Sequence, residues 1–288
     1  MIRHPDHAPL PTTATAPATA APATAAPATA TVGTVTPAVV PGTPGSARDR
    51  DPLDVVPVRP GLHLLRFPIG QAYLWDDGDG ESTLVDAGWA GAADAVDRAL
   101  RRVGGDGARL RRIVLTHCHR DHVGAAAELA RRHGAEVLAH RLDAPVIRGE
   151  APVPDPDLLE WEVPLYQHGL TVPEAPPTPV HRELAEGDVL DFGGGAHVLH
   201  TPGHTDGSLA VHLPRHGVLF TGDTVASVGG VALGVFHVDR ATAAASMRRL
   251  AALPADTLRT VCFGHGEPLT GDAAAVLRAA AAATAPGA

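Results

Sequence analysis

The chain has 288 residues, a formal net charge of -9 and 44% hydrophobic residues. This length allows one large domain or two small ones. The acidic balance argues against a nucleic-acid backbone as the main partner, because phosphate binding requires a basic surface. No run of 18 apolar residues occurs, so we expect no membrane span. The two cysteines, Cys118 and Cys262, allow at most one disulfide, which favours a reduced, cytoplasmic chain.

The N-terminal region has a composition unlike the rest of the chain. Residues 9–45 are almost entirely Ala, Pro and Thr and include the stretch PTTATAPATAAPATAAPATATVGT. Repeated proline blocks helix formation, and few bulky side chains are present to offset the ordering entropy. We therefore predict a disordered tail over residues 1–50 and a folded domain over residues 51–288.

The first half of this domain predicts strands joined by short turns. Residues 71–78 and 82–88 flank the turn sequence DDGDGE, which suits a β-hairpin. The helical spacing of residues 89–105 ends at Gly104-Gly105, a helix stop signal. In chain order, the expected elements are strands 61–69, 71–78 and 82–88, helix 89–105, strand 111–117, helix 123–134 and strand 135–140.

Residues 148–182 interrupt this order. They are rich in proline and acidic residues, so we expect a long insertion or lid. Short strands separated by Gly and Pro turns then return, together with two helices. The expected elements are strands 188–192, 196–201, 209–213, 217–223 and 260–266 and helices 241–253 and 272–284. Without strict βαβ alternation, this order predicts an α/β (α+β) fold of two sheets flanked by helices.

Polar residues gather where the apolar strands end. The stretch IVLTHCHRDHVGA, residues 113–125, brings three histidines and an aspartate directly after a strand, and three later strands also end near a His or an Asp. Loops at strand ends are where a rigid scaffold presents functional groups. The candidate ligands are His117, His119, Asp121, His122, His204, Asp223 and His265.

The chemistry of these side chains indicates a metal site. Imidazole and carboxylate together suit a borderline divalent ion such as zinc. Seven N/O ligands are too many for one tetrahedral ion, but they fit two ions that share a bridging carboxylate. Structural zinc sites usually use thiolates and are closed, whereas His/Asp sites with spare positions are usually catalytic.

Five separated blocks carry a family resemblance. THCHRDH matches the HxHxDH signature of the metallo-β-lactamase-fold hydrolases, a motif that glyoxalase II enzymes share. The blocks LVDAG, TPGHTDGS, FTGDT and FGHGEP come in that superfamily's order. The chain therefore resembles this superfamily over roughly residues 55–280. The resemblance implies a four-layer αββα sandwich with its site at one edge, between the two sheets.

The resemblance also implies a division of the ligands between two zinc ions, with iron or manganese as alternative metals. His117, His119 and His204 would hold the first ion, and Asp121, His122 and His265 the second. Asp223 would bridge both ions.

The expected reaction is hydrolysis. Two adjacent dications lower the pKa of a shared water to about 7, as for a single zinc, and so supply a bridging hydroxide as nucleophile. Asp121 is positioned to hold a proton and pass it to the leaving group. Asp86, in VDAG, would not bind metal itself but would orient the ligands by hydrogen bonds. A turn-stabilising role for Asp86 remains open.

The substrate is harder to predict. Glyoxalase II enzymes add a C-terminal helical domain, whereas only one helix is expected after FGHGEP, which weakens that interpretation. The remaining hypothesis is hydrolysis of a small ester, thioester, lactone or lactam, with a small molecule as the only expected partner and the oligomeric state open. The alternatives are a mononuclear-iron persulfide dioxygenase and a catalytically silent metal-binding protein. The glycine-cysteine run usual in those dioxygenases is absent from GDTVASVGGVALGVF.

The insertion is the candidate for specificity. The chain has only ten Phe, Trp and Tyr residues, yet Trp161 and Tyr166 both fall in residues 148–182. We predict that they form an aromatic lid over an apolar substrate, with His237 reaching the site from a neighbouring loop. Anchoring of a long loop to the core is an equally good explanation of the two aromatics. Cys118 and Arg120 are expected to face away from the metals.

Overall fold

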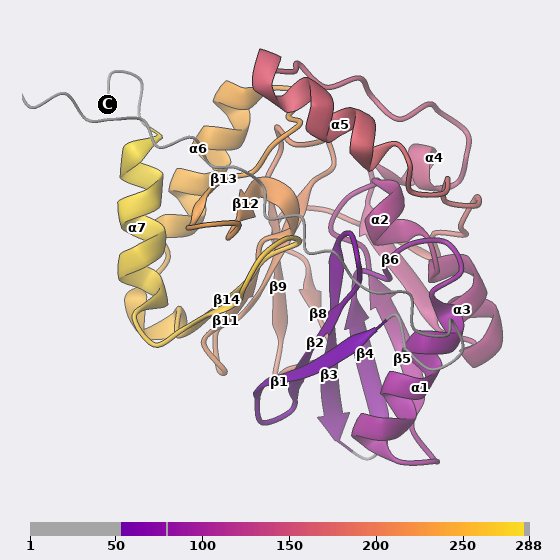
Figure 1. Ribbon diagram of the computed structural model, residues 1–288. Coiled ribbons are helices and arrows are strands. Elements are labelled where there is room, and N and C mark those ends of the chain that lie inside the picture. Colours follow the sequence, from indigo (N-terminus) through magenta and orange to yellow (C-terminus); the bar gives the residue numbers. More distant parts are fainter. Residues whose placement is uncertain (1–52, 79, 285–288) are drawn as a thin grey trace, which may run out of the picture. The chain divides into compact units, whose positions relative to one another are not determined.

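The computed structural model describes residues 53–78 and 80–284, so the predicted tail of residues 1–50 lies outside the described part (Figure 1). The strands are β1 (Asp54–Arg59), β2 (Leu62–Arg66), β3 (Gln71–Gly78), β4 (Glu81–Val85), β5 (Arg109–Val114), β6 (Glu136–His140), β7 (Arg182–Leu184), β8 (Val189–Leu190), β9 (Ala196–His200), β10 (Leu209–Leu213), β11 (Val218–Phe220), β12 (Val225–Ala226), β13 (Ala232–Leu233), β14 (Thr260–Cys262) and β15 (Leu269–Thr270). The helices are α1 (Ala93–Gly104), α2 (Arg120–Val123), α3 (Ala126–His133), α4 (Ala144–Ile147), α5 (Val163–Gly169), α6 (Arg240–Ala251) and α7 (Ala273–Ala283), with 3₁₀ turns η1 (Glu160–Glu162), η2 (Gly222–Thr224) and η3 (Ala255–Thr257).

Two sheets form the centre of the fold. The first has seven strands in the order β1-β2-β3-β4-β5-β6-β7, antiparallel up to β4 and parallel from β4 to β7. The second has six strands in the order β15-β14-β11-β10-β9-β8, in which only β11 and β14 pair in parallel. The predicted hairpin is β3–β4.

Side-chain alternation along the strands creates a separate core on each sheet face. On β3, Tyr73 and Trp75 pack between the two sheets, whereas Leu74 packs toward the helices. The same division holds on β5, where Val114 faces the second sheet and Ile113 the helices. The space between the sheets is therefore filled by apolar side chains from both.

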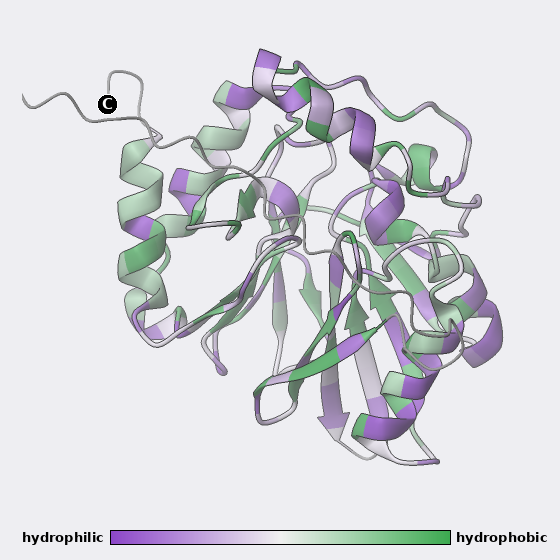
Figure 2. Cartoon of the chain, in the orientation of Figure 1, coloured by the Kyte–Doolittle hydropathy of each residue, from purple (hydrophilic) through white to green (hydrophobic). Residues whose placement is uncertain are grey.

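Helices cover the outer faces of both sheets. The α1 and α3 helices pack on the first sheet, and α6 and α7 pack on the second (Figure 1). Figure 2 shows hydrophobic residues along the strands and hydrophilic ones on the exposed sides of α1 and α3. These layers form the αββα sandwich that the sequence predicts.

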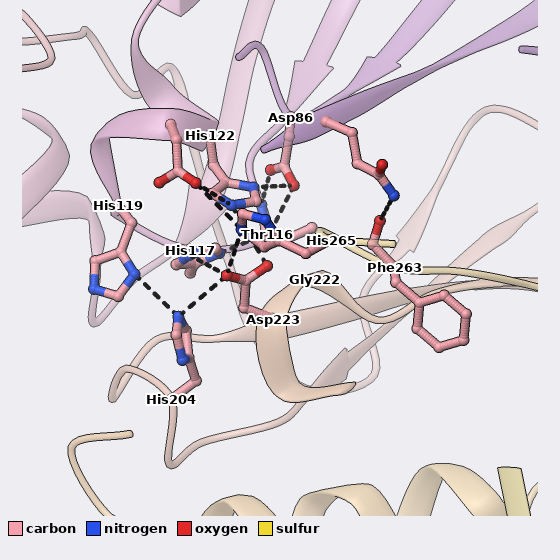
Figure 3. Close-up of polar contacts among 12 residues, drawn as sticks. Asp86, Thr116, His117, His119, His122, His204, Gly222, Asp223, Phe263 and His265 are labelled. Carbon is pink, nitrogen blue, oxygen red and sulfur yellow. Dashed lines mark hydrogen bonds and ion pairs between the residues drawn. The ribbon is translucent and has the colours of Figure 1, made fainter. Parts of the chain in front are cut away.

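The strand pairing brings the candidate ligands toward one edge. Phe220 on β11 pairs with Cys262 on the parallel strand β14, and Asp223 and His265 each come three residues later. Parallel strands end at the same edge of a sheet, so both loops emerge together. The first-sheet strand β5 delivers His117 and its neighbours to this region from the other side (Figure 3).

Several short elements were not predicted. Residues 148–182 contain η1 and α5 as well as irregular chain, and α4 precedes them. The first residue of β7, Arg182, also lies within the predicted insertion. These elements are only three to seven residues long, too short for a periodic hydrophobic pattern to reveal them.

The inter-sheet core is expected to carry much of the stability. Phe220 is 1% exposed and packs edge-on against Tyr73, with ring centroids 5.4 Å apart. Phe220→Ala should lower the free energy of unfolding by about 3–5 kcal/mol, because it leaves a cavity between the sheets. Urea unfolding measures this change. Val276→Ala, at a 39% exposed position on α7, is the matched control and should change it by less than about 0.5 kcal/mol.

Candidate metal centre

The first group of candidate ligands surrounds the start of α2. His119 is the N-cap residue of this helix, so Asp121 and His122 fall in its first turn. His117, just before, is 1% exposed, and His122 is 0% exposed. One tight turn after a buried strand therefore places all four side chains in the same region.

The other three candidates come from the second sheet. His204 follows β9, Asp223 lies in η2 directly after β11, and His265 follows β14. Figure 3 shows their side chains converging with those of the first group. All seven predicted ligands are thus brought together at one edge of the sandwich.

Asp223 lies at the centre of the cluster. Its Oδ2 is 3.2 Å from His265 Nε2, 3.7 Å from His204 Nε2 and 3.9 Å from His117 Nε2. Its Oδ1 is 3.4 Å from His122 Nε2. Asp223 therefore lies close to histidines of both predicted metal sets, His117 and His204 as well as His122 and His265, as a bridging carboxylate must.

The side chains can be grouped by the distances between their ligand atoms. Within each group, one N or O atom per residue lies within 4.8 Å of the others, so each group can hold a metal ion. The groups are His117, His119 and His204; His117, His122 and Asp223; and Asp121, His122 and His265.

Unpartnered atoms provide the test of whether a metal fits. His117 Nε2, His122 Nε2 and Asp223 Oδ1 are buried and have no hydrogen-bond partner. Leaving such atoms unpaired is costly, and native proteins rarely do so without an ion, a water or a functional reason. Because these atoms face one another, the donor set fits divalent metal ions.

In three of the histidines, the Nδ1 atom, on the other side of the ring from Nε2, contacts an oxygen. His122 Nδ1 lies 3.0 Å from Asp86 Oδ2, and His204 Nδ1 lies 3.0 Å from the Val235 carbonyl. His117 Nδ1 lies 3.0 Å from Thr116 Oγ1, whose proton goes to Asp86. With Nδ1 as the donor in each of these contacts, Nε2 is the nitrogen that faces the cluster and that can bind a metal.

Asp86 is the residue behind these contacts. Its carboxylate accepts from Thr116 N and Thr116 Oγ1, both at 2.8 Å, as well as from His122. It adopts a positive φ of 60° and is 3% exposed. Asp86 thus contacts a candidate ligand, His122, and also Thr116, a partner that the sequence did not single out.

The electrostatics of the cluster divide the histidines into two kinds. Burial lowers the pKa of His117 and His204 well below the ordinary value, so both rings are neutral. Burial also opposes protonation of His122 and His265, but nearby carboxylates, Asp223 first, outweigh it. They raise the pKa of His122 well above its ordinary value and that of His265 to about 10.

The two carboxylates respond in the opposite direction. Burial opposes ionisation of Asp121 and Asp223, but the neighbouring histidines outweigh it and hold both pKa values well below the usual range. Both carboxylates are therefore ionised at neutral pH. A bound cation would replace the protons on His122 and His265, so metal binding should release protons.

Contacts across the sheets hold the loop that carries His265. Gln71 Nε2 donates to the carbonyls of Phe263, at 2.8 Å, and Gly266, at 2.7 Å, on either side of His265. Gly264 is needed in this loop because a Cβ there would overlap Asp223 Oδ1. In the sequence, the only signal for Gln71 is a polar amide side chain at the start of an otherwise apolar strand.

Cys118 and Arg120 lie between the ligands but take no part in the cluster. Cys118 is 5% exposed and packs in the helix-side core, and burial raises the pKa of its thiol well above the ordinary value. Arg120 instead donates to the Val172 carbonyl, at 3.1 Å, in the insertion.

The predicted substrate residues occupy different environments. Trp161 is 56% exposed. The ring of Tyr166 lies edge-on to Phe236, with centroids 5.3 Å apart. His237 is 0% exposed, its Nε2 contacts the Gly234 carbonyl at 2.8 Å, and its ring lies 5.5 Å from that of His204. His237 therefore packs beside the candidate ligand His204 and is not exposed at the surface.

Comparison with known proteins assigns the family. The profile of the metallo-beta-lactamase superfamily matches residues 65–265. The chain belongs to this superfamily. It is 33% identical over 194 residues to the hydroxyacylglutathione hydrolase of Cereibacter sphaeroides (strain ATCC 17029 / ATH 2.4.9), a match that covers 66% of the chain and 59% of that protein. The chain thus spans about three fifths of this relative's length.

Other similar proteins align over more of their own length. The probable metallo-hydrolase YflN of Bacillus subtilis (strain 168) is 29% identical over 237 residues, covering 73% of the chain and 86% of that protein. The structure of TTHA1623 in a di-iron-bound form is 33% identical, with a TM-score of 0.52, and covers 71% of the chain and 92% of that protein. The family protein TTHA1429 from Thermus thermophilus is 26% identical, with a TM-score of 0.55 and 79% coverage of each chain.

Among the helices of residues 53–78 and 80–284, none has the length and apolar character needed to cross a bilayer.

Asp86 gives a direct test of how the ligands are held. Asp86→Asn keeps the shape and tolerates the positive φ, but replaces an acceptor oxygen with a donor. We expect metal affinity to fall by about 10–100-fold, because His122 and Thr116 lose their shared acceptor. Titration of metal-free protein with zinc measures this. Asp76→Asn, at the partly exposed end of β3 where Asp76 accepts from Gly78 N, is the control, and equal affinities for both variants would contradict the role.

Proposed function

We propose that this superfamily member is a dinuclear metal-dependent hydrolase that acts on thioesters of small acyl groups. The observation that carries the proposal is the set of buried, unpartnered His117, His122 and Asp223 atoms that face one another in the cluster. Esters, lactones and lactams were equally compatible with the sequence. Relatives named hydroxyacylglutathione hydrolase, at 33% identity, favour the thioester among these four bond types.

The proposed ligand assignment follows the clusters described above. His117, His119 and His204 hold one ion, Asp121, His122 and His265 hold the other, and Asp223 lies between them. We propose zinc as the native metal, since imidazole and carboxylate ligands suit it. Iron is the main alternative, because a relative was solved in a di-iron-bound form.

The metal ions, when bound, supply an activated water and polarise the substrate carbonyl. The chain's own residues orient the candidate metal ligands and protonate the leaving group. Asp121, whose Oδ2 lies 3.3 Å from His122 Nε2 and 3.2 Å from His265 Nε2, is ionised and can take a proton and pass it to the leaving thiolate. Asp86 and Thr116 keep His122 and His117 in the orientation that points Nε2 inward.

The other hypotheses differ in metal content. A mononuclear-iron oxygenase would need a single iron and would leave the Asp121, His122 and His265 group without a role. A silent protein would show no turnover with any metal. Both cysteines are free and buried, so a reducing, cytoplasmic location remains part of the proposal.

The zinc-loaded protein is expected to hydrolyse an acyl thioester faster than an oxygen ester, lactone or β-lactam of matched size. Asp223→Ala should lower metal content and kcat/KM together, kcat/KM by more than about 100-fold, because it removes the carboxylate shared by both groups. Elemental analysis and thiol-release kinetics measure the two quantities. Asp256→Ala, at an exposed position in η3, is the control. Near wild-type activity in Asp223→Ala would make the bridging assignment wrong.

Trp161 and Tyr166 test the predicted lid. If they contact the substrate, Trp161→Ala and Tyr166→Ala should each lower kcat/KM by about 10-fold, the usual effect of a lost apolar contact. Trp161→Ala should leave the melting temperature unchanged, since Trp161 is 56% exposed. Unchanged kcat/KM and unchanged melting for both variants would contradict the lid.

A further inference from the structure

Glu162 carries a carboxylate that the proposed chemistry does not use. The residue is 0% exposed, and both carboxylate oxygens contact Arg240 Nη2, at 2.8 and 2.7 Å. Oε2 also accepts from Leu159 N at 2.9 Å. A buried carboxylate is unfavourable unless it is paired, and removing one partner of such a pair is strongly unfavourable. The contact with Arg240 therefore determines where the chain around Glu162 can lie.

Buried carboxylates elsewhere in this protein hold ligand-bearing loops. Among the buried residues of the described chain, the other two carboxylates are Asp86 and Asp143. Asp86 acts on the first ligand block, as described above. Asp143 accepts from Thr205 Oγ1 at 2.7 Å, next to His204. The role of Glu162 therefore depends on where its partner, Arg240, lies in the fold.

Arg240 comes directly after the segment that contacts the His204 loop. It is the first residue of α6 and follows a segment that makes three hydrogen bonds with the His204 loop. The Val235 carbonyl contacts His204 Nδ1 at 3.0 Å, and Val238 N donates to the His204 carbonyl at 3.3 Å. Asp239 N donates to the Gly203 carbonyl at 2.9 Å. The Glu162–Arg240 pair thus joins the insertion to the immediate surroundings of a candidate ligand.

Two more contacts join the same parts of the chain. We name residues 157–172 the cover segment. Asp157 N donates to the His237 carbonyl at 2.8 Å, and the Tyr166 ring packs edge-on against Phe236. Together with Glu162, these residues attach one side of the cover segment to residues 234–240.

The far end of the cover segment is attached to the first ligand block. Arg120, directly before Asp121, donates to the Val172 carbonyl at 3.1 Å. The α5 helix in between has no buried residue. With no buried side chain of its own, this helix is held by the Tyr166 ring contact and by the polar contacts of Glu162 and Val172 on either side of it. The segment thus runs from one ligand-bearing loop to another.

The cover segment also exposes an unusual share of large apolar side chains. Five of the ten exposed large hydrophobic residues of the described chain lie in it, at 40–56% exposure. They are Leu159, Trp161, Val163, Leu165 and Leu170. The ring contacts of Tyr166 with Phe236 and of His237 with His204 attach this apolar segment next to a candidate metal ligand. An apolar acyl group bound at the metal site is the occupant that this placement favours.

We propose that Glu162 is a positioning residue: through Arg240 it fixes the cover segment beside the metal site, and the segment's apolar side chains then select the substrate's acyl group by length. The inference rests on the proposed thioester hydrolysis. Longer apolar acyl groups should be favoured over acetyl, because each added methylene gains apolar contact only while the segment is held in place.

The test compares wild type with Glu162→Gln on a series of straight-chain acyl thioesters from acetyl to octanoyl. The variant should keep its metal content and its kcat for acetyl within about twofold. For octanoyl, KM should rise about 10-fold, the effect expected for one lost apolar contact. Glu186→Gln, which weakens an exposed ion pair with Arg249 at the other end of α6, is the matched control and should behave as wild type.

A second variant keeps the test valid if Glu162→Gln fails to fold. Arg240→Lys retains a positive charge but loses the planar guanidinium, so it should show the same KM effect at a smaller size. Limited proteolysis adds a readout independent of turnover: cleavage within residues 157–172 should be faster in both variants than in Glu186→Gln. If wild type hydrolyses no thioester yet proteolysis responds as expected, the positioning role stands and the proposed function fails.

Three results would overturn the inference. The first is an active wild type whose KM and proteolysis are unchanged in Glu162→Gln. The second is an equal loss for all acyl lengths or a loss of metal, which would mean a general structural role. The third is a wild-type dimer that Trp161→Ser converts to a monomer without altering the acyl-length profile, which would show that a second copy of the chain covers the apolar residues.

Discussion

The candidate site depends on keeping ionised carboxylates and histidine rings together in a buried place. Asp223 lies within 3.9 Å of histidine nitrogens from four different positions, and its own Oδ1 has no hydrogen-bond partner. Such a cluster is unfavourable in an empty apolar core, because buried charges and lone pairs need partners. Divalent ions satisfy these atoms at once, so the arrangement is explained by metal binding better than by stability of the sandwich alone.

Around this centre, hydrogen bonds fix each ligand from outside. Asp86 and Thr116 set the direction of His122 and His117, the Val235 carbonyl sets that of His204, and Gln71 holds the loop of His265. Most of these contacts cross between chain segments that are far apart in sequence. The two sheets therefore act as rigid supports, and the site lies where their strand ends meet.

The sequence predicts the part of this arrangement that chemistry dictates locally. A metal restricts its ligands to a few residue types, and strand ends place them, so HxHxDH and the later His and Asp blocks identify both fold and family. Positions set by distant partners are not predictable in this way. Glu162 and Arg240 are 78 residues apart, and neither has a local pattern that pairs them. The α5 helix was not predicted either, because its seven residues bury no side chain and so carry no hydrophobic pattern.

The central claim is that two ions occupy the cluster, divided by Asp223. Anomalous X-ray diffraction from crystals of the zinc-loaded protein, collected on both sides of the zinc absorption edge, tests it most directly. We expect two zinc peaks, one among His117, His119 and His204 and the other among Asp121, His122 and His265, with Asp223 between them. A single peak at full zinc saturation, or peaks outside these residues, would contradict it.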